Sequence, residues 1–239
     1  MKAIIMAGGK GSRLYPYSAT LPKPLMPLGN MPVLELLLRQ LLRAGITEVI
    51  LAVSHLRHLI EAFFGDGSRF GMRIQYSLED SPLGTAGPIG AVLDQLGEQF
   101  LLLNGDLVTS LDFRRMIQAH FDTRPDVTIG VFERDLTIEF GLIEMDSDLR
   151  MTDYHEKPSQ KHLISMGVYV IRAAAVRDFV APDRHLDMPQ LVLGMRHAGY
   201  DVRCHLQDCV WLDIGRPDDF ALAQQMIETQ MPVFLPPLT

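Results

Sequence analysis

The chain has 239 residues, of which 47% are hydrophobic, and a formal net charge of −7. This length fits one large α/β domain or two small ones, with ample apolar material for a core. The acidic balance argues against general affinity for nucleic acid or anionic membranes. It leaves room for a local basic pocket that binds a phosphorylated small molecule.

Targeting signals and cysteines give a consistent expectation. Lys2 leads directly into a strand-like run and a glycine loop, so no secretory signal is expected, and no apolar run approaches the roughly 20 residues that span a bilayer. Cys204 and Cys209 cannot make a disulfide framework and are predicted to be free thiols. A cytoplasmic location is therefore expected.

Short apolar runs alternate with amphipathic segments through the first half of the chain. Predicted strands cover 2–7, 47–53, 72–77, 99–106 and 127–133, and predicted helices cover 33–45, 55–65, 86–96 and 111–122. This alternation predicts right-handed βαβ units in a Rossmann-like, doubly wound α/β fold. The sheet is expected to be mixed but largely parallel, with helices on both faces.

The rhythm changes from about residue 134. A hairpin is expected from two runs that meet at residues 146–148, followed by a strand over 163–172. Helices are predicted at 172–180, 188–199 and 218–230, strands at 200–207 and 209–215, and an irregular tail over 231–239. No linker, low-complexity tract or hexapeptide repeat is visible, so one domain over 1–239 without a C-terminal β-helix is expected.

The informative motifs all follow predicted strands. They are AGGKGSR after the first strand, SPLGTAG after the third, NGD after the fourth and LDIG after a late one. Ligands of doubly wound sheets bind outside the carboxyl ends of the strands. One site built from these four motifs is therefore predicted.

The glycine loop is neither a P-loop nor a G-x-G-x-x-G fingerprint. Glycines at this point would bring main-chain donors close to phosphate oxygens, and Arg13 and Lys23 would add cationic donors. The competing interpretation is a plain strand-to-loop turn with solvated surface cations.

Two aspartates, Asp106 and Asp213, end apolar strands. Separately, each could cap a helix or pair with arginine. Together, beside a triphosphate loop, they suggest Mg²⁺, which prefers one or two carboxylates plus phosphate oxygens.

The ordered motifs resemble a known family. AGGKGSRLYPYSATLPKPL is similar to the signature G-G-x-G-[ST]-R-L-x-P…x-K-P of the sugar-1-phosphate nucleotidylyltransferases, and PLGTAG, NGD, FG, EKP and W-x-D-I-G follow in the family's order. Short mannose-1-phosphate guanylyltransferase-like members are the nearest likeness. The resemblance implies that an NTP and a sugar 1-phosphate give an NDP-sugar and pyrophosphate.

The resemblance also implies residue roles on the nucleotide side, which lies mainly in 1–133. Arg13 would hold the β- and γ-phosphates, and Lys23 would bridge the α-phosphate and the sugar phosphate, so both are expected to be catalytic. Asp106 and Asp213 would bind Mg²⁺. The residues expected to contact the nucleotide are Ala7, Gly8, Gly9, Gly11, Ser12, Glu79 and Gly84.

Guanine is the expected base. An ionised Glu79 only accepts hydrogen bonds, and guanine offers two adjacent donors, N1–H and N2–H, whereas thymine and uracil offer one donor flanked by acceptors. PLGTAGP also resembles the guanylyltransferase form of this loop. GTP is therefore favoured over other nucleotides.

The sugar-phosphate side is expected mainly in 134–230. The resemblance places Gly141 and Glu156 near the sugar and Lys157 near its phosphate. Many guanylyl and thymidylyl relatives have N-A-G where this chain has Ser165-Met166-Gly167, and similar S-M-G occurs in adenylyl members. Ser165 is thus a candidate sugar contact, but it does not define which sugar is bound. Mannose and manno-heptose are the favoured sugars, for synthesis of a surface polysaccharide.

Two other functions remain as alternatives. The same chemistry could make dTDP- or UDP-glucose, or the fold could serve as a non-catalytic nucleotide-sugar sensor or scaffold. A glycosyltransferase would need a D-x-D motif, which NGD followed by LVTS does not supply. Small molecules are the expected partners, with no nucleic acid or membrane, and a homo-oligomer is left open.

Overall fold

The computed structural model describes residues 1–9, 11, 19–79, 81–215 and 217–236. Its helices are α1 (Val33–Arg43), α2 (Arg57–Phe64), α3 (Pro88–Leu96), α4 (Phe113–Thr123), α5 (Ala173–Val176), α6 (Met188–His197) and α7 (Pro217–Phe234), with short 3₁₀ turns η3 (Lys23–Leu25) and η4 (Ser68–Phe70). Its strands are β1 (Lys2–Met6), β2 (Pro27–Leu28), β3 (Met31–Pro32), β4 (Glu48–Val53), β5 (Arg73–Leu78), β6 (Gln99–Asn104), β7 (Leu107–Thr109), β8 (Val127–Thr137), β9 (Leu142–Met145), β10 (Met151–His155), β11 (Ser159–Arg172), β12 (Val202–Leu206) and β13 (Trp211–Asp213).

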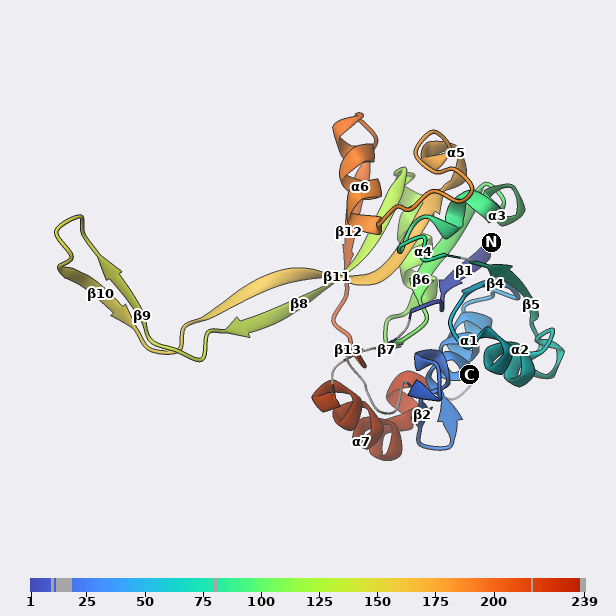
Figure 1. Ribbon diagram of the computed structural model, residues 1–239, viewed down its shortest axis with the longest axis horizontal. Helices are drawn as coiled ribbons and strands as arrows, with labels where there is room; N and C mark the ends of the chain where they lie inside the picture. The colour runs from blue at the N-terminus through green and yellow to red at the C-terminus, as the bar shows by residue number, and fades with distance from the viewer. Residues whose placement is uncertain (10, 12–18, 80, 216, 237–239) are drawn as a thin grey trace.

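A seven-stranded mixed sheet forms the centre of the described chain, in the order β12-β8-β11-β6-β1-β4-β5 (Figure 1). The strands β6, β1, β4 and β5 are parallel neighbours, with Ile4 of β1 opposite both Ile50 and Leu102. The strand β11 runs antiparallel between β6 and β8, and β12 is parallel to β8. The predicted doubly wound, largely parallel mixed sheet is confirmed.

Helices cover both faces of this sheet. On one face, Ile5 and Leu103 pack with side chains from α1, α2 and α4. On the other face, Ile4 and Leu102 pack with side chains from α3, α5 and α6. Because successive residues of a strand point to opposite faces, strands buried on both sides read as continuous apolar runs.

The C-terminal tail differs from the prediction of an irregular segment over 231–239. Helix α7 continues to Phe234, with non-helical φ/ψ at Gln230. Pro232 stands two residues after this break, in the first turn of the helical segment that follows. Proline is tolerated there because the N–H groups of a first turn have no acceptor within the helix. Phe234 is buried in a third apolar cluster with Met26 and Leu28, so tertiary packing holds the segment helical.

Strands β8 and β11 continue well beyond the sheet and form, with the β9–β10 hairpin, a long arm that projects from the body (Figure 1). The arm comprises residues 133–163. The predicted hairpin is confirmed, because β9 and β10 pair antiparallel. The predicted strand over 163–172 was too short, since β11 begins at Ser159 and stays paired with β8 along the arm.

No helix in the part of the chain that the structure describes is long and apolar enough to cross a membrane.

We expect Phe234→Ala to lower the free energy of unfolding by about 3 kcal/mol, because it removes a large buried aromatic side chain. Phe234 is 2% exposed and the neighbouring Val233 is 46% exposed. Val233→Ala therefore serves as the control and should change stability by no more than about 0.5 kcal/mol. Urea denaturation of both variants measures the difference, and equal effects would contradict the packing of this segment.

Candidate active site

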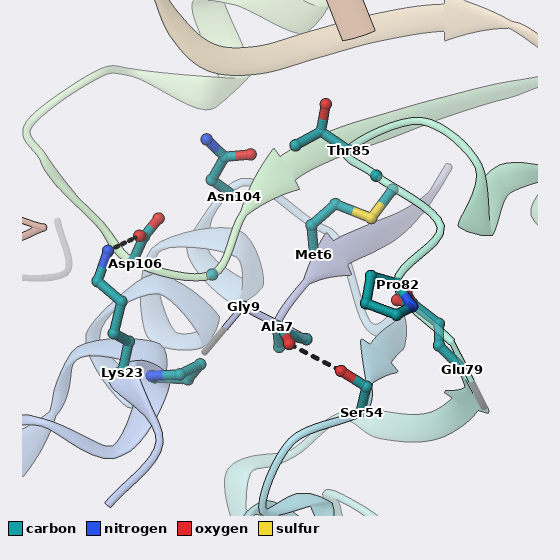
Figure 2. Close-up of a pocket in the computed structure, with 14 residues that line it drawn as sticks. Met6, Ala7, Gly9, Lys23, Ser54, Glu79, Pro82, Thr85, Asn104 and Asp106 are labelled. Carbon is teal, nitrogen blue, oxygen red and sulfur yellow. Dashed lines mark hydrogen bonds and ion pairs between the residues drawn. The ribbon is translucent and has the colours of Figure 1, made fainter. Parts of the chain in front are cut away.

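A cavity of about 300 Å³ lies at the carboxyl ends of β1, β4, β5 and β6 (Figure 2). Its lining residues come from the segments that follow these strands and from the η3 turn. They are Met6, Ala7, Gly8, Gly9, Lys23, Pro24, Ser54, Glu79, Pro82, Gly84, Thr85, Asn104, Gly105 and Asp106. Parallel strands end at one edge of a sheet, which is why three of the four predicted motifs meet here.

The glycine loop turns at the end of β1. The Ala7 N–H donates to the Ala52 carbonyl at 2.8 Å, and the Ser54 hydroxyl donates to the Gly8 carbonyl at 2.7 Å (Figure 2). A Cβ atom on Gly8 would stand 3.0 Å from Ser54 Oγ and 3.2 Å from Glu79 Oε1. The loop backbone therefore lies directly against the polar wall made by Ser54 and Glu79. Ser12 and Arg13 lie outside the described residues.

Glu79 is half-buried in the wall of the cavity. Burial raises the pKa of its carboxyl group, and the hydrogen bond that the Leu83 N–H donates to Oε2, at 3.3 Å, offsets part of this shift. Burial disfavours the charged form because water no longer solvates it. A ligand with N–H donors at this position would restore hydrogen bonds to the carboxylate.

The SPLGTAG segment is fixed against the start of α6. Gly84 has a φ of +78°, and a Cβ atom on it would lie 2.6 Å from the Leu186 carbonyl oxygen, so only glycine fits. The Thr85 N–H and hydroxyl donate to Asp187 Oδ1 at 3.0 and 3.3 Å. Asp187 also caps α6, so one carboxylate joins this loop to the helix.

Lys23 and Asp106 form an ion pair at one end of the cavity (Figure 2). The lysine side chain is 10% exposed and the aspartate 26%. A charge this poorly hydrated needs an opposite charge or a bound anion. The prolines on either side of Lys23 restrict the backbone of η3, which directs the ammonium group into the cavity.

Asp213 faces the same point from β13. A Cβ atom built on Gly215 would lie 3.0 Å from Lys23 Nζ and 2.9 Å from Asp213 Oδ1, so these two groups border one small volume. Asp213 Oδ1 accepts the Gly215 N–H at 2.9 Å. The strand β13 pairs with β7, which follows Asp106 directly, and this pairing brings the two predicted metal ligands together.

The predicted sugar-phosphate residues lie elsewhere in this structure. Gly141, Glu156 and Lys157 are on the arm, where Tyr154 Oη donates to Glu156 Oε2 at 2.9 Å. Ser165 lies at a register shift of β11, and its hydroxyl is 2.8 Å from Tyr169 Oη. None of these four belongs to the lining of the cavity, so their sugar roles stay predictions.

Sequence reasoning did not single out Ser54, Thr85 or Asn104, all of which line the cavity. Ser54 and Asn104 follow or end the parallel strands β4 and β6, so the rule for strand ends could have found them. Asp187 is different. Its contact with Thr85 spans 102 positions of the sequence and leaves no local signal.

The chain belongs to the nucleotidyl transferase family, whose pattern matches residues 2–230. It is 32% identical to the mannose-1-phosphate guanylyltransferase of Mycobacterium tuberculosis over 91% of this chain and 62% of that protein. It is 29% identical to the UTP–glucose-1-phosphate uridylyltransferase of Synechocystis over 97% of this chain and 66% of that protein. The chain thus spans about three-fifths to two-thirds of the length of these curated relatives.

The fold matches solved structures as well. The crystal structure of HddC from Yersinia pseudotuberculosis superposes with a TM-score of 0.73 and 24% identity, covering 95% of this chain and 99% of that one. This likeness establishes the common fold.

We expect Glu79→Gln to stabilise the ligand-free protein at pH 8 and the gain to shrink as the pH falls toward 4.5, the ordinary value for a glutamate. The folded-state pKa is raised, so folding favours the protonated carboxyl, and ionisation at higher pH opposes folding. Glutamine removes that charge and can still accept the Leu83 N–H. Thermal unfolding across this pH range measures the effect.

The exposed Glu228 on α7 provides the control, and Glu228→Gln should change stability by no more than about 0.5 kcal/mol at either pH. A Glu79→Gln gain that is independent of pH would contradict a desolvated, ionised Glu79.

Proposed function

We propose that the protein transfers a nucleotidyl group from a nucleoside triphosphate to a sugar 1-phosphate, releasing pyrophosphate. The observation that carries this proposal is the Lys23–Asp106 ion pair at one end of a cavity whose other wall is the glycine loop, with Asp213 beside Lys23. A cation and two carboxylates beside a loop of main-chain donors suit two phosphate-bearing substrates. Family membership supports the same reaction class.

The reaction needs no nucleophile from the protein. An ionised oxygen of the sugar phosphate attacks the α-phosphorus in line, a new P–O bond forms, and the bond to the β-phosphate oxygen breaks as pyrophosphate leaves. Both reactants are anions, so the barrier includes their mutual repulsion. The ammonium group of Lys23 would offset this repulsion and hold the two phosphates in line, which is catalysis by positioning and charge.

The carboxylates fit a magnesium ion. Among the described residues, no group of three or more His, Cys, Asp or Glu side chains is arranged to hold a metal ion, and the candidate site consists of Asp106 and Asp213 alone. Mg²⁺ takes one or two carboxylates and completes its shell with phosphate oxygens and water. When bound, Mg²⁺ would draw electron density from the α-phosphate. The predicted roles of Ser12 and Arg13 toward the triphosphate belong to the same proposal.

GTP is the nucleotide that we favour. Glu79 presents a desolvated carboxylate to the cavity. Guanine offers two adjacent N–H donors, which this carboxylate could accept together. The mannose-1-phosphate guanylyltransferase relative supports guanine and a manno-configured sugar. The uridylyltransferase relative keeps UDP-glucose synthesis as the second candidate.

We expect Lys23→Ala and Asp106→Asn each to lower kcat by about 10³-fold, because each removes charge complementarity at the reacting phosphates. Circular dichroism should show that both variants remain folded. Lys2→Ala and Asp122→Asn are controls for the same chemical changes at positions outside the lining of the cavity. Full turnover in either site variant would remove this end of the cavity from the mechanism.

The substrate pair is tested by measuring pyrophosphate release with Mg²⁺. GTP, dTTP, UTP, CTP and ATP are each combined with mannose 1-phosphate, glucose 1-phosphate and a manno-heptose 1-phosphate. Release mainly from GTP with a manno-configured sugar is expected. Release mainly from UTP with glucose 1-phosphate would favour the second candidate, and no release from any pair would favour a non-catalytic sensor.

We expect Glu79→Gln to lower kcat/KM for GTP by about tenfold or more and to change the values for UTP and dTTP far less. Glutamine can accept only one of the two guanine hydrogen bonds and places a donor against the other, and a mispaired polar group costs more than 1 kcal/mol. An equal loss with every nucleotide would show that Glu79 does not read the base.

A further inference from the structure

The arm is exposed along its whole length. Residues 133–165 are all described, and none of them is buried. Figure 1 shows the arm reaching away from the sheet, with the β9–β10 hairpin at its far end. An isolated two-stranded hairpin is only marginally stable in water, so a ribbon of this length needs a covering surface.

The hairpin at the end of the arm has one apolar face. In the register of β9 and β10, Ile143 lies opposite Tyr154, and Met145 lies opposite Met151. Opposite residues of an antiparallel pair share a face, and residues two apart along a strand do so too. These four side chains therefore form one apolar strip, and they are 61%, 50%, 63% and 65% exposed in the order just given.

The reverse face of the same hairpin carries one apolar side chain, Leu142 opposite His155, and is otherwise charged. Glu144 lies opposite Asp153, and His155 Nε2 lies 3.6 Å from Glu144 and 3.3 Å from Asp153. A division between an apolar face and a mainly charged face is typical of an antiparallel ribbon that is buried on one side and solvated on the other. In this chain the apolar face, which such a ribbon would normally bury, is exposed.

The accessible area supports an intermolecular cover. The chain exposes 12820 Å², whereas a compact monomer of 26.8 kDa exposes about 10,800 Å². The excess of about 2,000 Å² on one chain is more than the roughly 800 Å² that each partner of a specific protein–protein interface buries. Other apolar side chains of the arm are also exposed, outside this strip: Leu136, Ile138, Phe140, Leu149 and Leu163.

We propose that the apolar strip is the contact surface for a second copy of this chain, arm against arm about a two-fold axis. A two-fold interface uses the same surface on both partners, so the strip needs no complementary patch elsewhere. The strip carries no charge, and the acidic groups of Glu144 and Asp153 stay on the outer faces. The net charge of −7 therefore does not oppose the contact where it forms. Its methionines adapt readily to an opposing apolar face.

Other occupants fit the arm less well. Residues 133–163 contain eight Asp or Glu and four Lys or Arg, and this acidic excess disfavours an anionic membrane or nucleic acid. The body of the same chain is out of reach, because β8 and β11 stay paired from the sheet to Thr137 and Ser159 and hold the hairpin away from it.

Sedimentation velocity from about 1 to about 100 µM tests the proposal, in the affinity range where moderate interfaces dissociate. The wild-type chain should form a dimer as concentration rises. Ile143→Lys, on the strip, should raise the dimer dissociation constant by at least tenfold. The matched control is Glu144→Lys, which introduces the same residue one position away and changes the charge more. It should dimerise like the wild type.

A second measurement identifies the contact itself. In a Cys204→Ser and Cys209→Ser background, Met145→Cys treated with a short bismaleimide should give a covalent dimer. A wild-type chain that stays monomeric at every concentration would overturn the proposal, as would equal weakening by both lysine variants. A dimer that gives no Met145→Cys cross-link would place the second copy on another surface and would also overturn it.

Discussion

The parallel pairing of β6, β1, β4 and β5 is the constraint on which the rest of this structure depends. Strands β6, β1 and β4 are buried on both faces, so their backbone groups must pair with neighbouring strands and helices must cover their side chains, whereas β5 is a partly exposed edge strand. Because the four strands run parallel, their carboxyl ends all lie at one edge of the sheet. The cavity is a consequence of this arrangement, because the loops leaving that edge have no further strand to pair with.

Charge inside the cavity follows from the same geometry. Lys23 is brought in by a proline-bounded turn, and Asp106 by the end of β6, although the two are 83 positions apart in the sequence. In a poorly hydrated place, each charge needs the other. A phosphate could replace the aspartate as partner of the lysine, and a cation could replace the lysine as partner of the aspartate. The ligand-free ion pair thus keeps both groups in position.

The arm stands apart from this arrangement. Its strands begin inside the sheet, where β11 pairs with β6 and β8, and leave it without any covering helix. The body is stabilised by side chains buried between layers, whereas the arm has only its own ladder and one apolar strip. Gly141, Glu156 and Lys157 lie on the arm and outside the lining of the cavity. Their sequence motifs did not indicate this separation.

The sequence alone determined the alternation of strands and helices, the largely parallel mixed central sheet and the placement of AGGKGSR, SPLGTAG and NGD at strand ends, because apolar periodicity and glycine turns are local properties. Only the tertiary structure decided what depends on distant segments. The pairing of β13 with β7 brings Asp213 toward Lys23, and the contact of Asp187 with Thr85 fixes the SPLGTAG loop. The burial of Phe234 keeps its segment helical, and the strands of the arm extend beyond the sheet. Each of these rests on packing between residues that are remote in the chain, for which local sequence carries no signal.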